Sequence, residues 1–187
     1  MLLPRSSGIQ LPVFSLPSRF GIGDLGPAAY AFADFLEQTG QRVWQILPLT
    51  PTSEVHGHSP YFCPSSLALN PWLISPEMMA DDGWITKKDI SSIPEFPKDR
   101  VVYHRVLRYK NRLFASAFKR FRDRRSVDDF EEFCTKQADW LDDYALFAAL
   151  KTRYAKDDWN TWPDNIRLRR KKAVTAYWKD LLPDIDR

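Results

Sequence analysis

The feature that most constrains the fold is a strand, a helix and a second strand in close succession near the start of the chain. Residues 9–14 alternate between apolar and other side chains, which predicts a short strand ending near Phe14. Apolar residues then recur at helical spacing between Pro27, suited to a first helical turn, and Gly40, suited to a C-terminal cap. The apolar run 43–47 predicts the second strand. Strands joined through one helix pair in parallel with a right-handed crossover, so an α/β fold is expected.

A long segment without helical or strand periodicity follows the second strand. Residues 48–71 are rich in proline and far exceed the usual connection of about 2–6 residues. Connections of this length are usually functional. Because this one leaves the carboxyl end of a parallel strand, we expect it on the face where α/β folds build their sites.

The rest of the chain is predicted to be mainly helical. One apolar stripe runs from about Arg100 to Phe121, a second helix is predicted over Val127–Tyr154, and a last amphipathic stretch covers Ile166–Leu182. The buried side of the second helix is predicted to include Phe130 and Phe133. The first helix is basic and the second begins with acidic residues, which favours an antiparallel hairpin.

Composition excludes several classes of protein. The chain has 187 residues, 44% apolar and 14% aromatic, enough for a packed core. Its net charge of +3 is too small to imply a polyanionic partner. Cys63 and Cys134 are far apart and lack metal-ligand spacing, so reduced thiols are expected rather than a zinc or disulfide scaffold. No apolar run reaches the length of a signal peptide or membrane span, and we expect a cytoplasmic protein with no membrane partner.

Four stretches of the chain form a specific combination. They are RSSGIQLPVFSLPSRFGIGDLGPAAYAFADFL at 5–36, GQRVWQILPLTPT at 40–52, HSPYFCPSSLALNPWLISPE at 58–77 and WLDDYALFAALK at 140–151. In this order, and followed by Trp159-Asn160-Thr161-Trp162-Pro163, they resemble the amylomaltases, or disproportionating enzymes, a family of 4-alpha-glucanotransferases. One stretch would be a weak signal, but four in register are specific. The resemblance spans residues 5–163.

The resemblance implies a (β/α)8 TIM barrel that is incomplete in this chain, since such a barrel takes about 250 residues. Residues 1–75 would form its first β-α-β unit, with 48–71 as a long sugar-facing loop. Residues 76–163 would form an inserted, mainly helical subdomain, and 164–187 a truncated helix. The chain would thus supply two strands and one crossover helix.

The resemblance also implies a reaction without cofactor or metal. Members of the family transfer an α-1,4-glucan segment, as in maltodextrins, to the 4-hydroxyl of a glucose or maltodextrin acceptor by retaining double displacement. This chemistry needs a carboxylate nucleophile and a second carboxyl group about 5–5.5 Å away. The resemblance places both beyond position 187, so no catalytic residue is expected here and the chain alone is expected to be inactive. The alternative is a non-catalytic glucan-binding protein or a degenerate remnant.

Ser59 and Tyr61 match the family residues that line the donor sugar subsites. A tyrosine ring can cover the apolar face of a pyranose while its hydroxyl donates a hydrogen bond. Without the resemblance, a tyrosine packed beneath its own loop would be the simpler interpretation. The loop departs from the common family pattern at Phe62-Cys63-Pro64 and at Leu69, where glycine is usual.

Other polar and aromatic groups favour simpler roles. His56 and His58 lie two residues apart without a third ligand nearby, so a solvated or sugar-contacting pair is favoured over a metal site. The basic run 167–172 favours a solvated helix face over nucleic-acid binding. Trp159 and Trp162 are candidates for a cleft, although packing at a helix end is the favoured interpretation.

Overall fold

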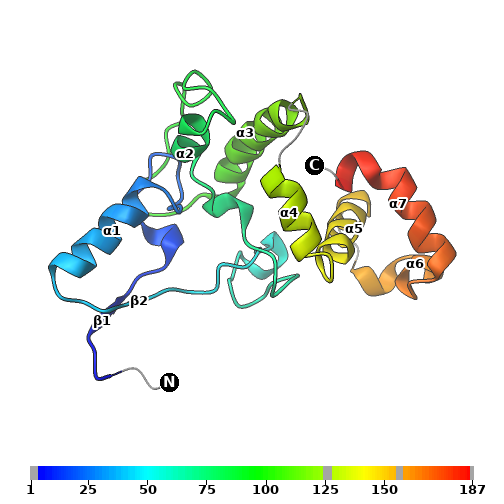
Figure 1. Ribbon diagram of the computed structural model, residues 1–187, viewed down its shortest axis with the longest axis horizontal. Coiled ribbons are helices and arrows are strands. Elements are labelled where there is room, and N and C mark those ends of the chain that lie inside the picture. Colours follow the sequence, from blue (N-terminus) through cyan, green and yellow to red (C-terminus); the bar gives the residue numbers. More distant parts are fainter. Residues whose placement is uncertain (1–3, 124–127, 155–157, 186–187) are drawn as a thin grey trace. The chain divides into compact units, whose positions relative to one another are not determined.

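A computed structural model describes residues 4–123, 128–154 and 158–185. The chain divides into two compact units, Met1–Arg124 and Arg125–Arg187. The first contains β1 (Gly8–Gln10), α1 (Pro27–Gln38), β2 (Val43–Gln45), α2 (Pro76–Asp81) and α3 (Tyr103–Asp123), and the second contains α4 (Asp128–Lys136), α5 (Leu141–Arg153), α6 (Asp164–Arg167) and α7 (Lys171–Ile185) (Figure 1). Short 3₁₀ turns cover Val13–Ser15, Glu54–His56, Pro71–Leu73 and Trp159–Thr161.

The predicted β-α-β unit is confirmed. β1 and β2 pair in parallel, with Gly8 opposite Val43 and Gln10 opposite Gln45, and α1 connects them (Figure 1). Gly40, with φ of 72°, follows the end of α1 in the left-handed conformation that suits glycine. The helix boundaries therefore follow from local sequence signals.

Both strands are shorter than predicted, and the expectation of a strand reaching Phe14 is wrong. β1 ends at Gln10, and Val13–Ser15 form a 3₁₀ turn instead. Pro12 lacks the N–H that a continuing strand would donate, which explains the early end. β2 likewise ends at Gln45, before the predicted Leu47. The two-stranded sheet is therefore small, and most of the first unit consists of loops and helices.

Two apolar clusters hold the first unit together. One joins α1 to the loops, through Val13, Leu16, Ala29 and Leu73, and Trp44 packs against it while its Nε1 donates to the Leu11 carbonyl at 2.7 Å. The other packs α3 against the loops, through Phe20, Ile85, Ile90, Tyr109 and Leu113.

α3 itself confirms the helix predicted from the apolar stripe. The antiparallel hairpin predicted between α3 and the helix expected over Val127–Tyr154 stays a prediction, as does the division into 1–75, 76–163 and 164–187.

The second unit corrects two helix predictions. The single helix expected over Val127–Tyr154 is two helices, because Trp140, with φ of −134°, leaves helical geometry between α4 and α5. The amphipathic stretch Ile166–Leu182 is likewise divided into α6 and α7, with Arg169 in the left-handed conformation between them.

Packing in the second unit shows which of the predicted core side chains are buried. Its core contains Leu146, Leu150, Trp162, Ile166 and Leu181. Burial of Trp162 confirms the favoured packing interpretation, whereas Trp159 is exposed. Phe130 and Phe133, predicted to be buried, are 47% and 46% exposed. Apolar periodicity identifies one face of a helix, but it does not show whether a neighbouring element covers that face.

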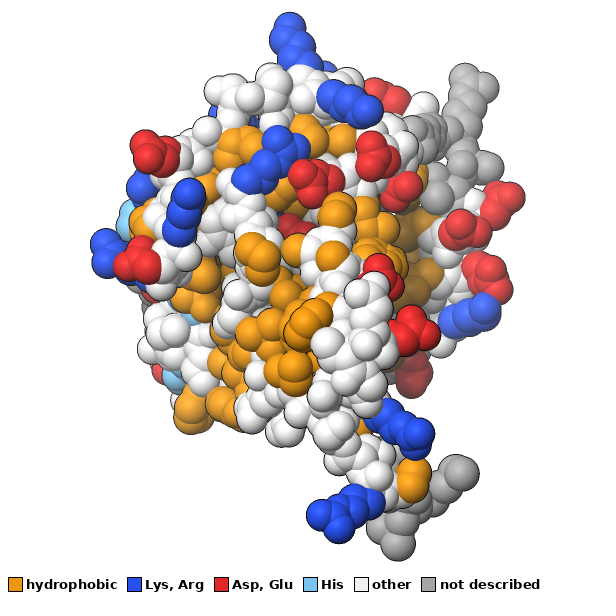
Figure 2. All heavy atoms as spheres, turned by 90° about the vertical axis from the view of Figure 1, so that its left-hand side faces the viewer, with side chains coloured by type: hydrophobic (Ala, Val, Ile, Leu, Met, Phe, Trp, Pro, Cys, Tyr) orange, Lys and Arg blue, Asp and Glu red, His pale blue; other side chains and the backbone are white. Residues whose placement is uncertain are grey.

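Exposed apolar side chains mark the first unit. On the side where Figure 1 draws α1 and the strands, Figure 2 shows hydrophobic side chains gathered across the middle of the view. Exposed residues of this unit include Leu25, Tyr30, Phe35 and Ile46. Within the described part of the chain, no helix is long and apolar enough to cross a bilayer.

The ion pair between Asp89 and Arg120 of α3 predicts that the stability of the fold depends on pH. Asp89 Oδ2 accepts from the Thr86 backbone N–H at 2.7 Å and lies 3.0 Å from Arg120 Nη2. The Thr86 hydrogen bonds, and then Arg120, lower the pKa of Asp89. Because the folded pKa is the lower one, this stabilisation is present above the unfolded value of 3.8 and is lost as pH falls through the folded pKa.

We therefore predict that Asp89→Asn lowers the free energy of unfolding near neutral pH by up to about 1 kcal/mol. The difference between the variant and the wild type should shrink as the solution is acidified below the ordinary pKa of an aspartate. Urea unfolding across an acid-to-neutral pH series measures both quantities. A difference that stays constant with pH would contradict the prediction.

Candidate functional site

Two loops leave the carboxyl ends of β1 and β2 on the same edge of the sheet. The first runs over residues 11–26 and the second over 46–75. They are bonded to each other, since the Leu25 N–H donates to the Leu73 carbonyl at 2.9 Å. The carboxyl edge of a parallel sheet is where α/β folds place ligand sites, so this pair of loops is the candidate site.

The second loop has an ordered tip that contains both predicted site residues. The Ser53 carbonyl accepts from the N–H groups of His56 and His58, at 3.2 and 2.9 Å. After this turn, Ser59 Oγ accepts from the Tyr61 N–H at 3.4 Å. Tyr61 is 68% exposed, so it is not packed beneath its own loop. The structure thus brings Ser59 and Tyr61 into one turn and leaves the tyrosine ring open to a ligand.

Aromatic rings surround this tip. Phe62 is 60% exposed and stacks on His56 with ring centroids 5.0 Å apart. His58 stacks on Tyr103 of α3 at 4.1 Å, with the rings 14° from parallel. Burial lowers the pKa of His58, which favours its neutral imidazole at neutral pH. Exposed rings on a polar turn suit a ligand with both apolar faces and hydroxyl groups.

A groove lies beside the first loop. Its volume is about 1030 Å³, and its walls come mainly from residues 14–24 and 96–101. Tyr103 also lines it, so the ring that supports His58 belongs to the groove as well. The volume matches the upper end of the roughly 300–1,000 Å³ typical of small-molecule sites.

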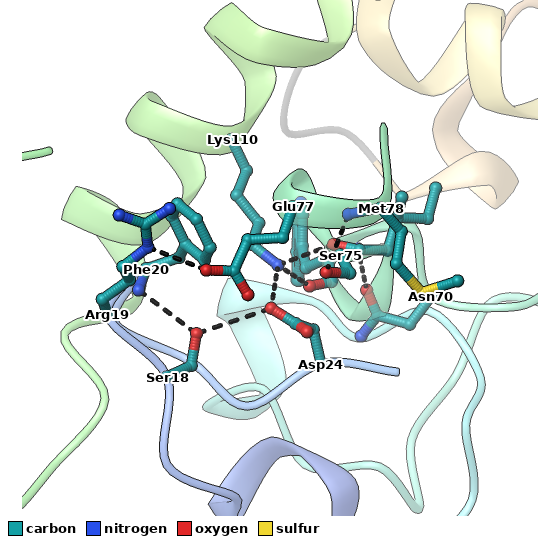
Figure 3. Close-up of polar contacts among 11 residues, drawn as sticks. Ser18, Arg19, Phe20, Asp24, Asn70, Ser75, Glu77, Met78 and Lys110 are labelled. Carbon is teal, nitrogen blue, oxygen red and sulfur yellow. Dashed lines mark hydrogen bonds and ion pairs between the residues drawn. The ribbon is translucent and has the colours of Figure 1, made fainter. Parts of the chain in front are cut away.

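Lys110 fixes both loops to α3, and its role is not evident from the basic character of that helix. Its side chain is fully buried. The Nζ donates to the carbonyls of Trp72 at 2.5 Å and Ile74 at 2.9 Å, and lies 3.7 Å from Asp24 Oδ2 (Figure 3). An ammonium group has three N–H donors, and here each faces an acceptor. One side chain of α3 therefore holds both loops near their carboxyl-terminal ends.

A sequence signal for this role exists. Lys110 follows Val106 by four residues and precedes Leu113 by three, and both of these are buried. That spacing places the lysine on the apolar face of α3, where a charge is costly unless it is paired.

The charges around Asp24 balance burial against pairing. Burial raises the pKa of Asp24, while the nearby Lys110 ammonium opposes the rise. Burial lowers the pKa of Lys110 to about 8, and Asp24 opposes that change. The negative charge of Glu77 also raises the pKa of Asp24. Glu77 is itself paired with Arg19, whose Nε lies 3.0 Å from Glu77 Oε1 (Figure 3). At neutral pH the arrangement is a buried ion pair completed by backbone carbonyls.

Close packing supports the same pair. A Cβ added at Gly26 would lie 2.6 Å from Asp24 Oδ1 and 2.7 Å from Ser75 Cβ. Only glycine fits there without displacing these groups. Asn70 Oδ1 accepts from the Trp72 N–H at 3.0 Å, so the backbone of Trp72 is held through both its N–H and its carbonyl.

The remaining candidates form no site of their own. Across the described residues, no cluster of three or more His, Cys, Asp or Glu could hold a metal ion. Cys63 and Cys134 are free thiols. Within the basic run 167–172, Arg167 pairs with Asp164 and Arg169 pairs with Asp143, both at 2.6 Å. These ion pairs agree with a solvated helix face.

Comparison with known proteins identifies the family. The sequence profile of the 4-alpha-glucanotransferases matches residues 11–186. The chain is 45% identical over 185 residues to a 4-alpha-glucanotransferase of Synechocystis sp., covering 97% of this chain and 36% of the relative. It is 40% identical over 177 residues to the 4-alpha-glucanotransferase of Thermus thermophilus, covering 93% of this chain and 34% of that protein.

A solved structure agrees with the sequence comparison. The amylomaltase from Streptococcus agalactiae in complex with acarbose matches with a TM-score of 0.88 and 34% identity, over 98% of this chain and 37% of that one. The parallel strands and site-bearing loops thus define part of an α/β enzyme fold of the amylomaltase type. The chain belongs to the 4-alpha-glucanotransferase family. It spans about a third of the length of the relatives it matches, 36% and 34% for the first two above.

The Lys110 anchor leads to a stability prediction. Lys110→Met keeps a long side chain but leaves the Asp24 carboxylate and two carbonyls unpaired, so the free energy of unfolding should fall by about 3–5 kcal/mol. Adding Asp24→Asn removes the uncompensated charge and should recover part of that loss. Urea unfolding of the wild type, both single variants and the double variant measures the coupling. Strictly additive losses would show that the two residues do not act as a pair.

Proposed function

We propose that this chain forms the glucan-binding flank of a 4-alpha-glucanotransferase. Its ligands would be α-1,4-glucans such as maltodextrins, with glucose or a maltodextrin as acceptor. In the complete protein, β1, α1 and β2 would be the first elements of a (β/α)8 barrel. The transfer would need neither cofactor nor metal.

The proposed reaction is a retaining double displacement. One carboxylate attacks the anomeric carbon while a second carboxyl group protonates the leaving oxygen, and the same group then deprotonates the acceptor hydroxyl. We assign both carboxyl groups to residues outside 1–187. The part played by this chain is to bind and orient the donor sugar, through the Tyr61 ring and the Ser59 hydroxyl.

The observation that carries the proposal is the exposed Tyr61 on the carboxyl edge of the sheet. Tyr61 is 68% exposed although it lies in a turn fixed by backbone hydrogen bonds. A preorganised aromatic ring binds a sugar face at small entropic cost, because few rotors must be fixed. The acarbose complex of the similar Streptococcus agalactiae protein supports an oligosaccharide as the class of ligand.

Removal of this ring tests the proposal. Tyr61→Ala should weaken the binding of maltoheptaose by about 1 kcal/mol, or roughly fivefold in Kd, because the stacking surface is lost. Tyr30→Ala provides a matched control, because Tyr30 is an exposed tyrosine of α1, 61% exposed. Isothermal titration calorimetry measures both.

The control separates a specific site from general sugar adhesion. Tyr30→Ala should bind maltoheptaose as the wild type does. Equal weakening by the two variants, or no binding by the wild-type chain, would overturn the proposed glucan-binding role.

A further inference from the structure

The residue directly before Ser59 has an unusual backbone. His58 has φ of 58° and follows Gly57, whose φ is 59°. Glycine adopts this left-handed conformation freely, whereas a residue with a Cβ does so at a cost and only where its surroundings hold it. Such residues cluster at functional sites. The contacts of His58 show what holds it.

The His58 ring is held from three sides. It stacks on Tyr103 with centroids 4.1 Å apart, and it meets Trp72 edge-on, with centroids 5.6 Å apart and planes at 71°. Its Nδ1 lies 3.3 Å from Thr52 Oγ1. Tyr103 begins α3, whereas Thr52 and Trp72 come from opposite ends of the second loop. The ring therefore joins the loop to the helix.

These contacts continue to the buried anchor. The Trp72 carbonyl accepts from Lys110, and the Trp72 N–H donates to Asn70. The indole that meets His58 thus projects from a residue whose backbone N–H and carbonyl are both hydrogen-bonded. On the other side of His58, the Ser59 N–H donates to the His56 carbonyl at 3.1 Å, which begins the turn that holds Tyr61.

We propose that His58 is a positioning residue for glucan binding: its ring, held by Tyr103 and Trp72, fixes the turn from which Ser59 and Tyr61 face the sugar. This inference rests on the proposed function of that turn. His58 itself need not touch the glucan. Its effect is to keep the two ligand-facing groups in one orientation before binding, which lowers the entropic cost of association.

The variant His58→Asn removes the ring while retaining a residue type that tolerates the left-handed conformation. We expect its Kd for maltoheptaose to rise roughly 3- to 10-fold. We also expect faster amide hydrogen exchange at Tyr61 and Phe62, whose N–H groups bond to Ser59. The same substitution at His104, an exposed histidine of α3 that does not line the groove, is the matched control, and His104→Asn should leave both quantities unchanged.

A double-mutant cycle tests whether the ring contact is responsible. Tyr103→Leu removes the other half of the stack and should weaken binding as His58→Asn does. The Kd of the double variant His58→Asn/Tyr103→Leu for maltoheptaose should not exceed the higher of the two single-variant Kd values, because both changes release the same turn. If the double variant's rise in Kd equalled the product of the two single-variant rises, the two residues would act independently and the proposal would be overturned.

Hydrogen exchange separates this proposal from the proposed function. If the wild-type chain does not bind maltoheptaose, the proposed function fails, whereas the exchange rates still show whether His58 orders the turn. Unchanged exchange at Tyr61 and Phe62 in His58→Asn would overturn the positioning role even where maltoheptaose binds.

Discussion

The first unit depends on one buried ammonium group. Lys110 bonds to the carbonyls of Trp72 and Ile74 and faces Asp24, so α3 is joined to the loops that follow both strands. With strands of three residues each, the sheet alone cannot fix connections of this length. A buried ion pair costs desolvation, but removing one partner leaves an uncompensated buried charge and is strongly destabilising. The two loops of the candidate site are therefore held by α3 as well as by the apolar cluster on α1.

Local signals in the sequence account for the elements, and tertiary contacts account for the errors. Pro27 and Gly40 mark α1, and the parallel pairing follows from the strand-helix-strand order. β1 ends early because Pro12 lacks a backbone N–H to donate. The alternation of apolar residues predicts a strand without taking this missing donor into account. The second predicted helix divides at Trp140, whose backbone leaves helical geometry, and apolar periodicity carries no signal for such a break.

The sequence points to Ser59 and Tyr61 as residues of the candidate site, which stays a prediction, but it does not give their geometry. Ser59 and Tyr61 follow from the resemblance, and the structure adds that they share one turn with an exposed ring. The contribution of His58 could not be predicted, because Tyr103 lies 45 positions further along the chain (103 − 58) and the stack exists only in the folded unit. Lys110 could have been identified from its position between apolar neighbours on α3.

The central claim is that a glucan binds where the turn of Tyr61 meets the groove lined by Tyr103. The most direct measurement is a map of backbone amide chemical shifts, recorded by NMR during titration with maltoheptaose. The account predicts shifts concentrated at residues 59–62 and at 96–103, with the amides of α5 and α7 unchanged. Shifts confined to those two helices of the second unit, or no shifts at saturating maltoheptaose, would contradict it.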